Sequence, residues 1–437
     1  MARRLLLRLQ WNLFCLAVLL LASSLDVLPS AEAASLRPPS TQRLRACIVP
    51  QQPELTPIFA KPPVAANDDE DDDDEDDDDD DDDEDDEDFD EEAVRGWLAP
   101  DGVTCIAFGG SINAGVTSDS FALQKRGVAR LRGQDVITFP LTSTARLDAM
   151  TNADGWNIAT GLTIARRSGD DFVLDRATIS VGPLKVGRDV STFVFFDGAD
   201  FAFSARTPAR QATMLAYTLQ LTETLSATAS AENPPDAATA LAAGAATATG
   251  ARWPDLIGRV LYEGDTLTLH ASGALRELRR ADGRPTRLAS AFLLGASRDF
   301  TIGSVTHTLL AQAGGTLGGP VFIGSQLDST DALNLLTGGE IANGWSALTS
   351  LTSAWTDKVS TSAYASRYAL RVPSRTSTTG LIDVSRYAMN VVWKPALMVK
   401  VGLEVGWSHS DITLPRIAMN GASTQRTTAT IWLQKSF

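Results

Sequence analysis

Apolar and polar residues alternate along most of the chain from Val103 onward. In the clearest segment, which starts at Leu397 and ends at His409, one face carries Leu, Val and Trp while the other carries Met, Lys, Gly, Glu and Ser. Alternation with a period of two predicts β-strands that have one apolar face. A half-buried strand of a soluble sheet shows the same pattern, so a single segment does not separate the two environments.

This alternation predicts sixteen strands between Val103 and the C-terminus. Many of these segments are about 10 to 13 residues long, which is the length that a tilted strand needs to cross a bilayer. No stretch after the N-terminal region approaches ~18 consecutive apolar residues, so a membrane-spanning form requires a β-barrel. The predicted strands begin near Val103, Ser143, Trp156, Phe172, Leu184, Gln211, Thr224, Asp255, Thr266, Thr286, Thr301, Gly344, Val359, Asp383, Met398 and Ser423.

The predicted connections between these strands alternate in length. The short ones are 152–155, 182–183, 222–223, 264–265, 297–299, 356–358 and 394–397. The long ones are 119–142, 191–210, 233–254, 315–343, 371–382 and 411–422. Short turns at one end and long loops at the other are typical of outer-membrane barrels, whereas a sandwich would not sort its connections in this way. We therefore predict an all-β fold, a 16-stranded antiparallel transmembrane β-barrel over residues 103–437.

The aromatic residues support a membrane barrel. Trp345 and Trp355 lie on the same face of one predicted strand, and ten residues of a tilted strand rise about 25 Å, the height of the apolar band between two aromatic girdles. The chain ends on an alternating strand closed by Phe437, a pattern that resembles the outer-membrane assembly signal. Other aromatic residues predicted to face outward are Trp156, Tyr262, Tyr364, Tyr368, Trp393 and Trp407.

The N-terminus predicts an export signal. Positive charge in the first residues is followed by an apolar run from Leu13 to Ala22 and by Ala31-Glu32-Ala33, a small-residue cleavage pattern. We expect residues 1–33 to be a signal peptide, because the apolar run is too short to span a bilayer. Residues 34–102 would then form an N-terminal periplasmic segment.

An acidic tract changes the meaning of the net charge. The formal charge is −16, but residues 68–92 hold 24 of the 54 acidic residues, and the rest of the chain carries a net +8. Dense like charge predicts disorder. Three interpretations stay open, namely a solvated spacer, a tract that buffers divalent cations or attracts them to the entrance, and a mobile plug that enters the pore.

Several segments, in this order and spacing, resemble the trimeric porins of alphaproteobacteria, the rhizobial type. The resemblance runs along most of the chain after residue 33. It is carried by TCIAFGGSINAGV at 104–116, DRATISV at 175–181, VGR at 186–188, TFVFFDGAD at 192–200, WPD at 253–255, VWKP at 392–395 and VGLEV at 401–405. It implies a homotrimer in the outer membrane of a Gram-negative bacterium, in contact with its lipids, and passive diffusion of small hydrophilic solutes and ions.

The resemblance also implies where the channel is narrowed. In such barrels the loop after the fifth strand folds inward, and this loop is residues 191–210 here. Its phenylalanines would anchor it while its charges face the channel, and the alternative is an ordinary surface loop. The expected constriction residues are Asp197, Asp200, Arg206 and Arg210. The pore-wall residues expected from strand alternation are Arg146, Asp148, Arg176, Arg259, Arg367, Arg386, Lys400 and Glu404.

Members of this family carry two cysteines close together before the first strand. Here Cys47 and Cys105 are separated by the segment that holds the acidic tract. Export would place both in an oxidising compartment, so they form a disulfide or remain two unpaired thiols.

Other function classes fit the sequence less well. A barrel with a narrow, solute-specific channel is the first alternative, and a secreted, acidic, cation-binding β-protein is the second. An enzyme is disfavoured because the three histidines lie on separate predicted strands and no nucleophile or phosphate-binding motif accompanies them. Three Cys and three His residues also leave little for a metal site, so we expect neither a metal nor another cofactor.

Overall fold

The computed structural model describes residues 46–50, 93–125, 131–132, 136–153, 156–167, 172–196, 198, 201, 207–208, 210–233, 253–278, 287–324, 342–372, 380–413 and 422–437. The predicted signal peptide (1–33) and the acidic tract (68–92) lie outside these ranges. Within the ranges, no helix has the length and apolar character needed to cross a membrane.

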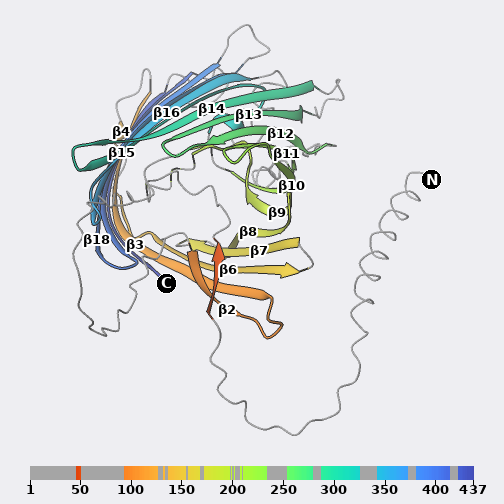
Figure 1. Ribbon diagram of the computed structural model, residues 1–437. Helices are drawn as coiled ribbons and strands as arrows, with labels where there is room; N and C mark the ends of the chain where they lie inside the picture. The colour runs from red at the N-terminus through yellow and green to blue at the C-terminus, as the bar shows by residue number, and fades with distance from the viewer. Residues whose placement is uncertain are drawn as a thin grey trace, which may run out of the picture. The chain divides into compact units, whose positions relative to one another are not determined.

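Sixteen of the described strands form one closed antiparallel barrel (Figure 1). Each strand pairs with the next along the chain, and the last strand closes the barrel by pairing with the first. The predicted fold class is therefore confirmed. The barrel strands are β3 (Thr104–Lys125), β6 (Leu141–Ala153), β7 (Trp156–Arg167), β8 (Phe172–Val181), β9 (Leu184–Val190), β10 (Gln211–Gln220), β11 (Leu225–Glu232), β12 (Asp255–Glu263), β13 (Leu267–Leu278), β14 (Arg287–Ile302), β15 (Val305–Leu317), β16 (Asn343–Thr356), β17 (Val359–Val372), β18 (Gly380–Ala396), β19 (Val399–Thr413) and β20 (Ala422–Ser436).

Two of the predicted turns are displaced. Residues 297–299 were expected to form a turn, but they lie inside β14, where the Asp299 carboxylate accepts a hydrogen bond from Thr308 Oγ1 at 2.6 Å. The chain turns later, at Gly303, which has a φ of 63°. Likewise β18 continues through Pro395 to Ala396, and the turn falls at Leu397 and Met398.

The two faces of the barrel wall differ in composition. On β13, Leu269 and Leu275 are exposed, whereas Thr268, Ser272 and Arg276 on the alternate positions are buried. A soluble sheet hides its apolar rows, so exposed apolar rows around a closed barrel fit a lipid environment. Figure 1 shows the C-terminal strands, coloured blue, curving round to lie beside β3.

The predicted N-terminal segment contributes two short strands to the sheet. β1 (Ala46–Pro50) pairs with β2 (Ala93–Leu98), and β2 pairs with the first residues of β3. On this edge of β3, β20 reaches only Ser111, so β2 pairs with the part of the edge that β20 leaves open. Two further strands, β4 (Leu131–Arg132) and β5 (Val136–Thr138), pair with the later half of β3.

Candidate functional site

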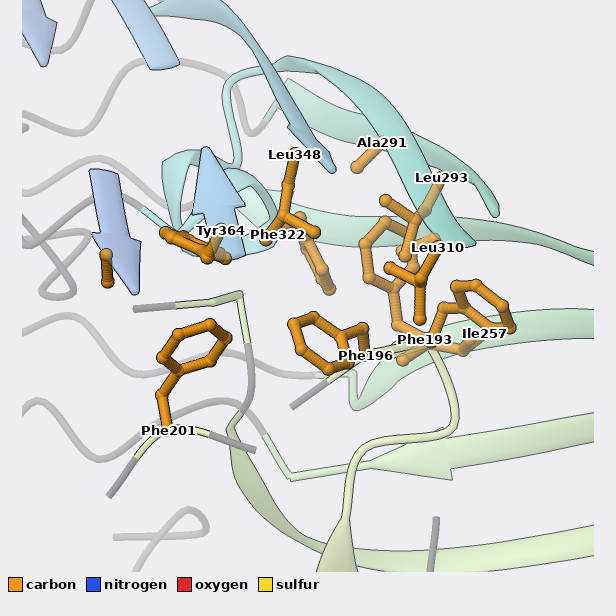
Figure 2. Close-up of a cluster of buried hydrophobic side chains, with 13 residues drawn as sticks. Phe193, Phe196, Phe201, Ile257, Ala291, Leu293, Leu310, Phe322, Leu348 and Tyr364 are labelled. Carbon is orange, nitrogen blue, oxygen red and sulfur yellow. The ribbon is translucent and has the colours of Figure 1, made fainter. Parts of the chain in front are cut away.

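The loop that follows β9 lies inside the barrel. Its described residues include four buried phenylalanines that pack against inward-facing side chains of β12 to β18 (Figure 2). The sequence prediction that phenylalanines anchor this segment is confirmed for these four. They are Phe193, Phe195, Phe196 and Phe201, and their partners include Ile257, Leu293, Leu310, Leu348 and Tyr364.

Polar contacts from the wall hold the loop backbone in place. The carbonyl oxygen of Phe193 accepts a hydrogen bond from Ser272 Oγ at 2.9 Å, and His270 Nε2 lies 3.3 Å from the same oxygen. The backbone N–H of Phe196 donates to the side-chain oxygen of Gln312 at 3.3 Å. The wall also leaves room for the loop, because a Cβ at Gly295 would lie 2.2 Å from the Phe195 ring.

A single buried carboxylate ties together the two ends of the loop. Glu232, at the end of β11, is fully buried. At the entry to the loop it accepts hydrogen bonds from Ser191 Oγ at 2.6 Å and from the backbone N–H of Thr192 at 2.9 Å. At the exit it pairs with Arg210 Nη2 at 2.8 Å. Glu232 therefore closes the base of the loop, and Arg210 belongs to this closure.

The same closure extends to two more buried charges. Arg210 Nη1 also lies 3.1 Å from Asp255 Oδ2, and Asp255 receives the Arg276 guanidinium, with Nε 2.8 Å from Oδ1. Two arginines and two carboxylates thus balance in charge, which is the condition under which buried ions are tolerated. The sequence predicts that Arg210 faces the channel as a constriction residue. In the structure its guanidinium is buried against the wall instead.

A second segment also enters the barrel, after β15. It contains the short 3₁₀ helix η1 (Pro320–Ile323). Phe322 is buried and packs on Phe193, with ring centroids 4.8 Å apart. The sequence predicts a long connection over residues 315–343 and does not place it inside the barrel. The apolar run Val321-Phe322-Ile323 is a signal that could have indicated an inward segment.

Charged side chains of β6 and β8 form a cluster on the barrel wall. Three predicted residues come together there, because Asp148 pairs with Arg146 and lies 3.6 Å from Arg176 Nη1. The Arg176 guanidinium crosses the wall over Gly161, where a Cβ would lie 2.8 Å from it. In the ring of sixteen strands, β6 to β8 stand opposite β14 to β16, against which the phenylalanines pack. The loop and this charged cluster therefore belong to opposite walls.

Other predicted wall residues also face inward. Arg259 donates to Thr228 Oγ1 at 3.2 Å, and Glu404 is fully buried on the inward row of β19. The strand register places Arg386 opposite Ser408, and Lys400 opposite Gln434, on the same inward face. Besides the network around Glu232, two further inward ion pairs were not predicted from the sequence, and they join Asp119 to Arg426 and Lys185 to Asp189.

The predicted inward position of Arg367 is wrong. Arg367 lies opposite Ser385, in the outward row of β18 that exposes Tyr387, and its side chain is 57% exposed. It pairs with Asp383 at 2.7 Å on the outer face. The alternation of β17 is one residue out of phase with the prediction, which places Tyr364 and Tyr368 on the outward face. Both are buried inside the barrel, where they pack with the two inward segments.

The remaining predicted site residues are covered only in part. Asp197, Asp200 and Arg206 lie outside the described residues. Cys105 is disulfide-bonded, and the side chain of Cys47 also lies outside the described residues. The backbone of Cys47 pairs with Gly96, and a Cβ at Gly96 would lie 3.0 Å from the Cys105 sulfur. Among the residues that the structure covers, no three His, Cys, Asp or Glu side chains are grouped to hold a metal ion.

Comparison with known proteins identifies the fold. No protein-family model matches the sequence, and no curated protein sequence matches it. Among solved structures, the outer-membrane channel DcaP of Acinetobacter baumannii is similar over 78% of this chain and 99% of its own, with a TM-score of 0.62 and 12% identity. OmpF of Salmonella typhi, in complex with daunomycin, covers 78% of this chain and 99% of its own, with a TM-score of 0.51 and 9% identity.

An anion-selective porin from Comamonas acidovorans covers 76% of this chain and all of its own, with a TM-score of 0.50 and 12% identity. At these identities the similarity concerns the fold alone. The chain has the barrel fold that these outer-membrane channels share.

Proposed function

We propose that this protein is an outer-membrane porin that forms a water-filled channel for passive diffusion of small hydrophilic solutes and ions. One observation carries the proposal: a barrel with exposed apolar rows holds, inside it, a loop anchored to one wall opposite a charged cluster on the other wall. An inward loop fastened to one wall narrows a channel without filling its whole cross-section. Conductance of the purified protein in a planar bilayer tests the proposal.

The channel mechanism follows from how charge is distributed across the lumen. The cluster on β6 and β8 holds two arginines and one aspartate, so it carries a net positive charge. We infer that Asp197 and Asp200 of the loop face this wall. Acids on one side and arginines on the other set up a transverse field, in which dipolar and charged solutes are oriented as they pass. Rings of charge of this kind determine ion preference.

Neutralising the loop acids should change that preference. The double substitution Asp197→Asn and Asp200→Asn removes two negative charges, so the cation-to-anion permeability ratio should fall on the order of twofold to fivefold. The reversal potential across a salt gradient in a planar bilayer measures this ratio. An unchanged reversal potential would show that these two acids do not contribute to selectivity.

The finer features of the proposal come from the family resemblance. We propose a homotrimer of the alphaproteobacterial type in the outer membrane of a Gram-negative bacterium, exported by a signal peptide over residues 1–33. We also propose a Cys47–Cys105 disulfide, which is supported by the adjacent backbone positions of β1, β2 and β3. Divalent cations are proposed partners of the acidic tract on the basis of its composition alone.

A further inference from the structure

The segment that follows β15 is built into the barrel interior by several independent contacts. Its base is closed where the N–H of Gly318 donates to the carbonyl oxygen of Ala342 at 2.7 Å. Thr316 Oγ1 donates to the Gly319 carbonyl and accepts from the Gly319 N–H, both at 2.9 Å. These bonds fix the turn that leads from the end of β15 into η1.

Two apolar side chains of η1 then pack in different directions. Phe322 enters the cluster that contains the loop phenylalanines. Ile323 enters a second cluster, with Tyr368 and Leu370 of β17. The wall makes room for Ile323, because a Cβ at Gly344 would lie 2.6 Å from its Cδ1. The segment is therefore fastened to the wall on one side and, on the other, to the loop after β9, called the first loop below.

The contact with the first loop is also electrostatic. The guanidinium carbons of Arg210 and Arg276 lie 4.8 Å and 4.9 Å from the centre of the Phe322 ring. Both arginines belong to the charge network that ties the loop ends to Glu232 and Asp255. A desolvated cation over an aromatic ring is stabilised by the ring quadrupole. Phe322 thus covers the network that closes the base of the first loop.

The two inward segments meet again beyond Phe322. A Cβ at Gly324 would lie 3.2 Å from the backbone nitrogen of Pro208, in the returning limb of the first loop, and Gly324 has a φ of 72°. Only glycine adopts this conformation readily at such a close approach. The returning limb and the segment after β15 are therefore in direct backbone contact.

We propose that the segment at 318–324 is a second constriction element and that Phe322 is a positioning residue, which holds the loop after β9 against the wall. This inference rests on the proposed channel function and deepens it. The two segments together fill the side of the lumen lined by β12 to β18. Solutes would then pass along the other side, which β6 to β8 line, through a narrower channel than one loop alone would leave.

Substitution of Phe322 tests the proposal. In Phe322→Ala the charge network at the base of the first loop loses the ring that packs on it, so single-channel conductance should rise on the order of 1.5-fold. Sugars that are too large to pass the wild-type channel should then enter liposomes that contain the variant. Phe322→Leu keeps apolar volume but lacks the ring over the arginines, so its conductance should be intermediate. The matched control is Phe300→Ala, which removes a ring stacked on His307, 5.2 Å between centroids, on the rows of β14 and β15 that alternate with the buried Ser297 and Thr308.

Folding and channel activity are read separately. Heat-modifiable gel mobility reports whether each variant retains its barrel, and if Phe322→Ala does not fold, Phe322→Leu carries the comparison. A wild-type protein without conductance would overturn the proposed channel function. A conducting wild type whose folded Phe322 variants keep its conductance and its sugar size limit would overturn only the second constriction element.

Discussion

Replacing Glu232 with Gln should destabilise the folded barrel by about 3 kcal/mol, because it leaves two buried arginines to share one carboxylate. Glu232 is the point at which Ser191, Thr192 and Arg210 meet, so both ends of the loop after β9 depend on it. The amide keeps the size of the side chain, so the loss reports mainly on its charge. We also expect a noisier and larger conductance, since the loop base is no longer closed.

Denaturant unfolding, followed by the heat-modifiable gel shift, measures this loss of stability. The matched control is Asp383→Asn, which removes the same charge from the exposed pair with Arg367 on the outer face and should leave the stability nearly unchanged. Equal effects of the two substitutions would mean that the buried network does not hold the loop.

Neutralising Arg146 and Arg176 together should shift ion preference toward cations. The cluster would change from a net positive charge to the single negative charge of Asp148. A unit charge at ~4 Å is worth about 1 kcal/mol even in bulk water, so the cation-to-anion permeability ratio should rise on the order of fivefold. Reversal potentials for Arg146→Gln with Arg176→Gln measure the change directly.

Arg367→Gln is the matched control for this experiment. It removes one positive charge from the outward face, so the reversal potential should stay at the wild-type value. A shift with Arg367→Gln, together with none in the double variant, would mean that the assignment of inward and outward faces is reversed.

The architecture was accessible from the sequence because its signals are local. Strand alternation depends on neighbouring residues, and turn positions depend on residues such as Gly182 and Pro183. The predicted strand starts lie within three residues of the observed ones, except that β15 begins at Val305 and not near Thr301. The loop phenylalanines were also visible, since aromatic residues crowded into a long connection need a surface to pack on.

The candidate site was harder to predict from the sequence, because it depends on which face each strand turns inward. Alternation gives two faces but does not say which one is inside, and a long loop resets the count before each new strand. Tyr364 and Tyr368 fitted an aromatic girdle equally well, which reversed the assignment of Arg367. The network of Glu232, Asp255 and Arg276 joins residues far apart in sequence, so only strand register brings them together.

Single-channel conductance of the purified wild-type protein in a planar bilayer tests the central claim most directly. A water-filled barrel narrowed by inward loops should insert with discrete conductance steps that increase with salt concentration, and a homotrimer should show them in groups of three. Boiling should abolish the conductance and convert the folded band into the band of the unfolded monomer. A protein that shows the folded, heat-modifiable band but never conducts would contradict the proposed channel and leave only the barrel fold.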